Sequence, residues 1–181
     1  MGTLSETEIK RLNRGWRRAT NGRIRLVLAE LSNPFNVGSI FRTAAVFGVE
    51  RMYLTGSTPG PSHAGVAKTA LGTTNAVAHE TVATVAEALD AARADGFTVY
   101  GVELAHDATP ISRCELSADA CLVLGNEAHG LSRTTLAACD ALLYVPQVGK
   151  VASLNVATTA GIALYEARRQ EWAGIEEPGE A

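Results

Sequence analysis

The chain has 181 residues, of which 46% are hydrophobic and 19% are charged, which is enough for one globular domain with a buried core. No apolar run approaches the roughly 18 residues that a membrane span needs, and the polar first ten residues lack the apolar segment of a signal peptide. We therefore expect a soluble, cytoplasmic domain and no membrane partner.

Cysteine and histidine usage argues against a disulfide framework or a metal centre. The three cysteines are odd in number and no two have the spacing of metal ligands, so we expect free thiols in a reducing compartment. The four histidines are scattered and form no HExxH pattern, so we expect no protein-bound metal.

Basic residues are concentrated near the N-terminus, although the net charge is −3. The first 25 residues hold seven basic residues against two acidic ones and so carry +5, which leaves −8 for the remainder. At helical spacing these side chains would form a stripe that could bind RNA phosphates. From charge alone, a solvated helix face explains the pattern equally well. The candidate RNA-binding residues are Lys10, Arg11, Arg14, Arg17 and Arg18.

Taken in chain order, the first half of the sequence alternates between helical and extended patterns. We predict a helix over 5–20, a strand over 24–31, a helix over 37–47 that ends at a glycine, a strand over 51–55 and a loop over 56–62.

The second half continues the alternation. We predict a helix over 82–94, strands over 97–104 and 120–124, a helix over 131–139, a strand over 141–145 and a helix over 153–170. This order predicts an α/β fold with a mostly parallel sheet flanked by helices. We expect residues 1–181 to form a single domain, with 1–23 as a basic helical extension and 171–181 as a disordered tail.

Three of the predicted strands end in polar, glycine-rich segments, at 104–107, 125–130 and 146–155. Because ligands of open α/β sheets bind beyond the carboxyl ends of the strands, we expect these segments to share one pocket. No P-loop or GxGxxG pattern is present, and the carboxylate of Glu127 inside the second segment would repel a phosphate. It would suit a ligand that offers hydrogen-bond donors or a positive charge such as a sulfonium.

Three motifs carry the most specific information: LSNPFNVGSIFRTA at 31–44, LVLGNEAHGL at 122–131 and VPQVGKVASLNVA at 145–157. Together and in this order they resemble the three motifs of the SpoU/TrmH-type RNA 2′-O-ribose methyltransferases of the SPOUT class. The resemblance extends from about residue 24 to about residue 170, and KTALG at 68–72 also resembles a segment of that family.

The resemblance implies a fold, a cofactor and an assembly. The C-terminal part, from about residue 120 onward, would thread through a loop as a trefoil knot, which ordinary folds almost never contain. The knot loops would bind S-adenosyl-L-methionine. The protein would be a homodimer whose active site is completed by residues from both chains.

The resemblance also implies roles for individual residues. Arg42 would be the central catalytic residue, either as a base or, because a guanidinium normally stays protonated, as a clamp on a substrate phosphate. Asn36 would orient Arg42 or cap its helix. Glu127 would hold Arg42 or the arginine of the partner chain, or open the helix that follows it.

Further site residues come from the same motifs. Ser153 and Asn155 would lie beside the target ribose and the cofactor, at the start of the last helix. The cofactor itself would contact backbone groups and apolar surface of Leu104, Gly125, Asn126, Val145 and Leu154.

The expected function is S-adenosylmethionine-dependent 2′-O-ribose methylation of RNA. We favour tRNA over rRNA, because no added RNA-binding domain is evident and the helices flanking the core resemble those of tRNA-modifying members. One alternative is an RNA-binding or assembly factor that keeps the knot fold without catalysis. Another is a methyltransferase of the same class that acts on a base or a non-RNA acceptor.

Overall fold

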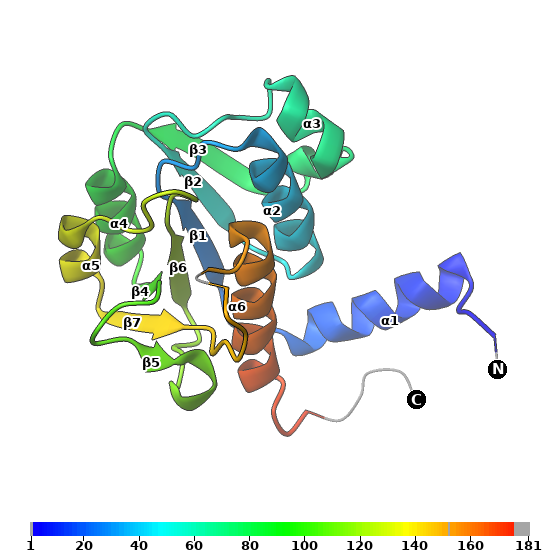
Figure 1. Cartoon of the computed structure of the whole chain (residues 1–181). Coiled ribbons are helices and arrows are strands. Elements are labelled where there is room, and N and C mark those ends of the chain that lie inside the picture. Colours follow the sequence, from blue (N-terminus) through cyan, green and yellow to red (C-terminus); the bar gives the residue numbers. More distant parts are fainter. Residues whose placement is uncertain (1, 152, 176–181) are drawn as a thin grey trace.

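The computed structural model describes residues 2–151 and 153–175, and its centre is a single seven-stranded sheet (Figure 1). The strand order is β3-β2-β1-β6-β4-β7-β5, and every pairing between these strands is parallel. All carboxyl ends therefore meet at one edge. The strands are β1 (Ile24–Leu28), β2 (Arg51–Thr55), β3 (Ala78–Val82), β4 (Thr98–Val102), β5 (Thr109–Pro110), β6 (Ala120–Leu124) and β7 (Ala141–Tyr144).

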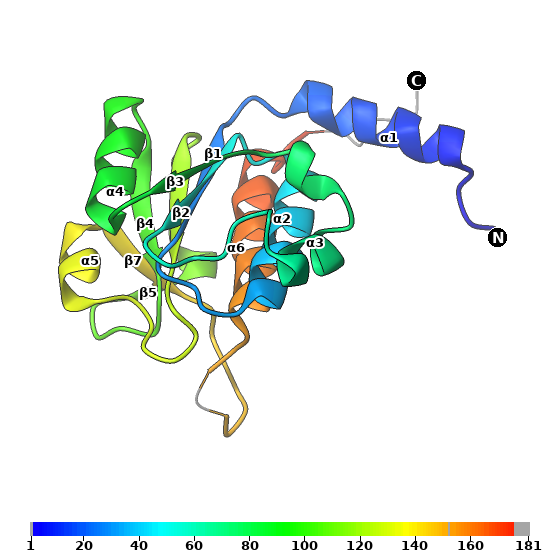
Figure 2. The same ribbon diagram turned by 90° about the horizontal axis from the view of Figure 1, so that it is seen from above.

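Helices cover both faces of the sheet, as the view from above shows (Figure 2). One face carries α2 (Pro34–Val46), α3 (Ala64–Ala70) and α6 (Val156–Glu171), and the other carries α4 (Val85–Ala94) and α5 (Arg133–Ala138). Two 3₁₀ turns, Thr73–Asn75 and Ile111–Arg113, complete the connections.

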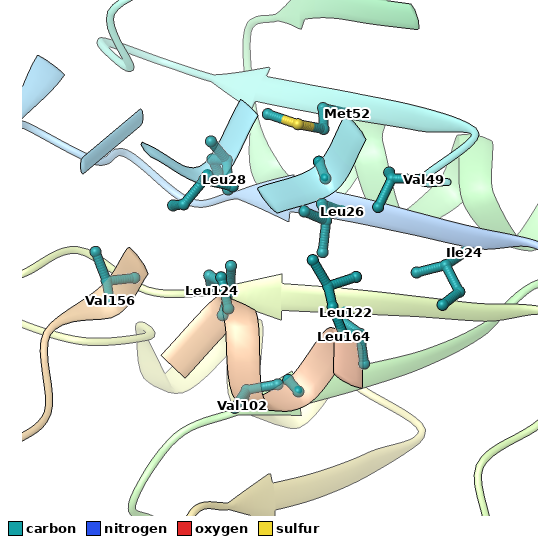
Figure 3. Packing of buried hydrophobic residues seen from close by; sticks show 14 of the residues in the cluster. Ile24, Leu26, Leu28, Val49, Met52, Val102, Leu122, Leu124, Val156 and Leu164 are labelled. Atoms are coloured by element: carbon teal, nitrogen blue, oxygen red, sulfur yellow. The ribbon is translucent and has the colours of Figure 1, made fainter. Parts of the chain in front are cut away.

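The two central strands, β1 and β6, are buried on both faces, which explains why they are apolar except for Arg25, a buried residue of β1 that pairs with Glu50 at 2.7 Å. Their even-numbered residues pack toward α2 and α6, where Leu26 and Leu122 are fully buried beside Leu164 (Figure 3). The odd-numbered Val27 and Val123 pack on the opposite face, toward α4. The predicted α/β class with a parallel sheet is therefore confirmed.

Three of the described helices and strands were not predicted: β3, α3 and the two-residue strand β5. The edge strand β3 is almost entirely exposed and lacks apolar alternation, so part of it was assigned to the helix that begins only at Val85. The short helix α3 lies in a stretch that we left unassigned after the predicted loop. The strand predicted over 24–31 ends at Leu28, because Glu30 adopts a positive φ of 56° and turns the chain toward α2.

A separate helix, α1 (Glu6–Ala19), projects from the body of the molecule (Figure 1) and has no buried residue. It begins with a capping box between Ser5 and Glu8. The Trp16 ring stacks on Trp172 at a centroid distance of 4.8 Å. The predicted N-terminal helix is thus confirmed.

Of the tail predicted as disordered over 171–181, residues 171–175 are described, and Glu171 is the last residue of α6. The Glu171 carboxylate accepts hydrogen bonds from the backbone N–H groups of Asn21 and Gly22, both at 2.6 Å. These bonds hold the end of α6 against the segment that follows α1. Residues 176–181 lie outside the described residues. Strand order does not test threading, so the knot stays a prediction.

Among the described residues, no helix is both long enough and apolar enough to span a bilayer. The same part of the chain contains no group of three or more His, Cys, Asp or Glu residues arranged to hold a metal ion.

Candidate active site

A cavity of about 640 Å³ opens at the carboxyl edge of the sheet. Its walls come from the segments after β4, β6 and β7, from the start of α2 and from the residues before α6. The three polar strand ends that the sequence suggested therefore do share one pocket. The predicted site residues in its lining are Asn36, Leu104, Gly125, Asn126, Glu127, Val145, Ser153, Leu154 and Asn155.

Glu127 connects the loop after β6 to the start of α2. One carboxylate oxygen accepts bonds from the Ser32 N–H (3.0 Å) and hydroxyl (3.1 Å), and the other from the Asn33 N–H (3.2 Å) and the Asn36 amide (2.9 Å). Partial burial opposes the charge, but these donors hold the pKa of Glu127 below its ordinary value. Glu127 thus remains an anion at neutral pH.

Asn36 carries the same network onward to α6. While its amide nitrogen donates to Glu127, its Oδ1 accepts a bond of 3.0 Å from the Asn155 amide. Asn155 is the N-cap of α6 and accepts from the N–H groups of Ala157 (2.9 Å) and Thr158 (3.3 Å). The three motifs are therefore joined by one directional chain of hydrogen bonds along the cavity wall.

Three predictions about where helices begin are corrected by the structure. The N-cap of α2 is Asn33, whose Oδ1 accepts from the Phe35 N–H at 2.9 Å, so Asn36 does not cap this helix. The last helix begins at Val156, so Ser153 lies before its first turn, exposed and in the cavity lining. Glu127 does not open α5 either, because the N-cap of α5 is Ser132.

The loop after β6 is held in a tight form by Asn126 and Gly125. The Asn126 amide donates to the Glu30 carbonyl at 2.6 Å, and its oxygen accepts from the Ala128 N–H at 2.8 Å. A Cβ on Gly125 would lie 2.5 Å from the Gly130 carbonyl carbon, so any larger residue would force the loop open. The backbone groups of this loop are therefore available to the cavity in a fixed arrangement.

Glu103 is a lining residue that the sequence analysis missed. Its carboxylate accepts bonds from the N–H groups of Leu104 (3.1 Å) and Leu131 (3.0 Å), and so ties the loop after β4 to the loop after β6. Glu103 lies inside the strand predicted over 97–104, whereas β4 ends at Val102, so its sequence position did not mark it as a residue of the cavity. Carboxylates from Glu103 and Glu127, beside apolar surface from Leu104 and Leu154, suit a ligand with a cationic and an apolar part.

Arg42 lies apart from the cavity. It is exposed on α2, six residues beyond Asn36, which is about 9 Å along the helix axis. Within the described residues it has no hydrogen bond or ion pair, and neither Asn36 nor Glu127 contacts it. The partnership predicted between Arg42 and these two residues is therefore absent within one chain.

The candidate RNA-binding residues all lie on α1, and residues 10, 11, 14, 17 and 18 cover about one third of its circumference. Ile9, Leu12 and Trp16 lie on the opposite side. Lys10 pairs with Glu6 at 2.6 Å, and both side chains are largely exposed. The described basic stripe is compact and faces solvent, while RNA binding by it stays a prediction.

Fold and cavity together define a class: an α/β protein with a parallel sheet and a cavity at the carboxyl ends of its strands that suits a small, partly cationic ligand. Comparison with known proteins narrows this class. The model of the SpoU rRNA Methylase family matches residues 23–165. The chain belongs to this family, and the predicted resemblance is confirmed.

Individual relatives agree with this assignment. The chain is 33% identical over 145 residues to the 23S rRNA (guanosine-2′-O-)-methyltransferase RlmB of Neisseria meningitidis, which is 80% of this chain but 58% of that protein. The AdoMet-bound rRNA methyltransferase from Sinorhizobium meliloti superposes with a TM-score of 0.77 and 29% identity, over 83% of this chain and 57% of the other.

A third relative differs in its coverage. The A. aeolicus TrmH/SpoU tRNA modifying enzyme is 25% identical with a TM-score of 0.75, and the match covers 97% of this chain and 90% of the other. The chain thus spans about three fifths of the first two proteins and most of the third. Because the S. meliloti protein was crystallised with AdoMet, S-adenosylmethionine is a cofactor of this family.

Proposed function

We propose that this chain transfers a methyl group from S-adenosylmethionine to a ribose 2′-hydroxyl of RNA. The observation that carries the proposal is the cavity at the carboxyl edge of the sheet, where one chain of hydrogen bonds joins Glu127, Asn36 and Asn155. Membership of the SpoU rRNA Methylase family gives the reaction class.

The residues of the cavity fit this cofactor. A volume of about 640 Å³ lies within the range of ligand sites, roughly 300–1,000 Å³. Val145 and Leu154 offer apolar surface for an adenine ring, and the carboxylates of Glu103 and Glu127 offer attraction to a positive charge. When bound, the cofactor would supply an electrophilic methyl group on a sulfonium.

We assign the remaining roles by position. Asn36 and Asn155 hold the start of α2 against the start of α6, and Ser153 lies exposed in the cavity lining beside them. Such fixed groups would hold a ribose hydroxyl in line with the methyl carbon. The hydroxyl proton must leave during transfer. Arg42 either removes it as the base or clamps a substrate phosphate while the proton leaves by another route.

The separation of Arg42 from the cavity supports a homodimer in which each arginine serves the cavity of the partner chain. Exposed apolar side chains on α2 and α6 are available for such an interface, because Val46 is 75% and Tyr165 is 53% exposed. This arrangement would explain why Arg42 has no partner among the described residues of its own chain.

We further propose that the substrate is a structured RNA in the cytoplasm. The three cysteines are free thiols, which a reducing compartment keeps in that state. The preference for tRNA derived from the sequence has little support, because the Neisseria relative is named for 23S rRNA while the A. aeolicus relative is named for tRNA. Both RNA classes therefore belong in the experiment.

The test uses purified protein, radiolabelled S-adenosylmethionine, and total tRNA and rRNA from a host that lacks this gene. We expect label in one pool, and Arg42→Ala should abolish it while cofactor affinity by calorimetry is unchanged. Alkaline digestion should leave the labelled nucleotide joined to its neighbour, because a 2′-O-methyl group blocks cleavage there.

Two outcomes would contradict the proposal. Label that alkaline digestion releases as a single nucleotide would assign the methyl group to a base instead. Absence of both label and cofactor binding would favour the alternative of an RNA-binding factor without catalysis.

A further inference from the structure

An exposed aromatic ring, Phe35, lies on α2 beside the cavity. We call the exposed side of α2 and α3 that includes Phe35 and Lys68 the α2–α3 surface. Phe35 lies in the first turn of α2, between Asn33 and Asn36, and both asparagines line the cavity. The Phe35 side chain does not line it and is 48% exposed. An aromatic ring of this exposure beside a ligand cavity is available to a group that approaches from outside.

A cation accompanies the ring. The ammonium group of Lys68, on α3, lies over the Phe35 ring at 6.0 Å from its centroid. Lys68 is exposed and forms no ion pair with any described carboxylate. Its charge is therefore available to an anion that also contacts the ring.

The arrangement of ring and cation is fixed by close packing of α3 on α2. The Thr69 hydroxyl donates to the Phe35 carbonyl at 3.0 Å. Gly38 and Gly65 allow the two backbones to approach, because a Cβ on Gly38 would lie 2.4 Å from the Val66 carbonyl oxygen. A preorganised surface loses less entropy on binding than a mobile one.

Negative charge is scarce on these helices: Glu127 places one carboxylate at the Asn33 N–H and the Asn36 amide, but α2 and α3 themselves contain no acidic residue. Between Glu30 and Glu80 the sequence contains a single carboxylate, Glu50, in a chain with 19 acidic residues. Glu50 precedes β2, at the edge of the sheet opposite the cavity, and is paired with Arg25 at 2.7 Å. The surface formed by α2 and α3 therefore combines positive charge with little that would repel a polyanion.

We propose that the α2–α3 surface holds an RNA strand beside the nucleotide that enters the cavity, with the Phe35 ring stacked on a neighbouring nucleobase and Lys68 on a phosphate. Stacking on an aromatic ring tolerates any base, and an adjacent cation matches the backbone. The inference rests on the proposed function, since it assigns part of the substrate contact to that site.

The test compares four variants in equilibrium binding to unfractionated tRNA and to a 23S rRNA transcript. Phe35→Leu should weaken binding of the accepted RNA by about 5- to 100-fold, while Phe35→Tyr retains it. Lys68→Gln should lower the slope of log affinity against log salt by about 0.7–0.9. Arg113→Gln, which removes an exposed charge at the opposite edge of the sheet, should leave affinity unchanged.

Cofactor affinity separates this inference from the proposed function, because neither Phe35 nor Lys68 lines the cavity. RNA binding that depends on both residues without methyl transfer would overturn the proposed function alone. Methyl transfer with unchanged RNA affinity in Phe35→Leu and Lys68→Gln would overturn the inference alone. Failure of the unaltered protein both to bind and to methylate either RNA would overturn the inference and the proposed function together. A smaller species for Phe35→Leu in light scattering would assign the surface to a second copy instead.

Discussion

At the scale of single residues, the site depends on the direction of its hydrogen bonds. Glu127 only accepts, and the four donors around it come from Ser32, Asn33 and Asn36. Because Asn36 gives its amide N–H to Glu127, its oxygen is left for Asn155. The sequence showed these residue types but not their pairing, since the partners lie 91 and 119 positions apart and meet only after the sheet has formed.

Replacing Glu127 by glutamine tests this directionality. In the native chain both carboxylate oxygens accept hydrogen bonds. Glutamine would replace one of these oxygens by an NH₂ group, which cannot accept, so the hydrogen bonds to that atom would be lost. We expect Glu127→Gln to lower the free energy of unfolding by about 1 kcal/mol and methyl transfer by about tenfold or more, through misplacement of Asn36. Denaturant titration and initial rates measure the two effects, and Glu115→Gln, an exposed carboxylate, is the control.

Acid should reduce the difference in unfolding free energy between the native chain and Glu127→Gln. Because the folded protein holds the pKa of Glu127 below its ordinary value of 4.5, the carboxylate stabilises the fold at pH values above that value. This contribution is lost as pH falls through the lowered pKa. The difference in unfolding free energy between the native chain and Glu127→Gln should therefore be constant above pH 5 and shrink below pH 4. A difference that grows on acidification would contradict this account.

At the scale of elements, α6 is tied to the site by its own cap. Asn155 closes the first turn of α6 with its oxygen and contacts Asn36 with its nitrogen. The sequence predicted a helix from Ser153, two residues too early for the cap, because a serine and an asparagine so close together are both good N-caps. One side chain therefore serves stability and site geometry at once.

Two substitutions separate these roles. Asn155→Ala removes the cap and should cost about 1 kcal/mol, which is a fall of about 2–4 °C in Tm for a chain of this size. Asn155→Asp keeps an acceptor for the helix, so its Tm should equal that of the native chain. Neither Asn155→Asp nor Asn155→Ala can donate to Asn36, so methyl transfer should fall in both variants. Equal activity of Asn155→Asp and the native chain would show that the Asn36 contact is dispensable.

The packing of α3 on α2 makes a second element-scale prediction. A Cβ on Gly38 would lie 2.1 Å from the Thr69 hydroxyl oxygen, so Gly38→Ala should separate the helices and cost about 1–3 kcal/mol. Gly161, on α6, has only an ordinary neighbour at 3.7 Å, and Gly161→Ala should instead stabilise by up to about 1 kcal/mol. Opposite signs in thermal unfolding would establish that α2 and α3 are in contact as described.

At the scale of the whole molecule, the parallel sheet was predictable because β1 and β6 are apolar apart from Arg25 and the strands alternate with helical patterns. The edge strand β3 was not predictable, because four of its five residues are exposed. Without a buried face, the strand shows no alternation of apolar and polar residues. The strand ends identified the cavity, because topology places them together. They could not identify Glu103, whose role depends on a loop contact with Leu131.

Charge is also distributed at the scale of the molecule: the first 25 residues carry +5 and the remainder −8. The helix α1, which holds five of the basic residues, projects from the body (Figure 1). Arg14, Arg17 and Arg18 are exposed, and no residue of α1 is buried. Replacing these three arginines by glutamine should therefore leave Tm unchanged. If all three contact phosphates, the slope of log RNA affinity against log salt should fall by about 2–3.

The matched control is Arg113→Gln, which removes one exposed charge outside α1 and should leave the slope unaltered. Cofactor affinity should be identical in all variants, because α1 does not contribute to the cavity. An unchanged slope for the triple variant would mean that the α1 stripe is only a solvated helix face. RNA recognition would then depend on the surface beside the cavity, where Lys68 and Arg42 supply the positive charge of α2 and α3.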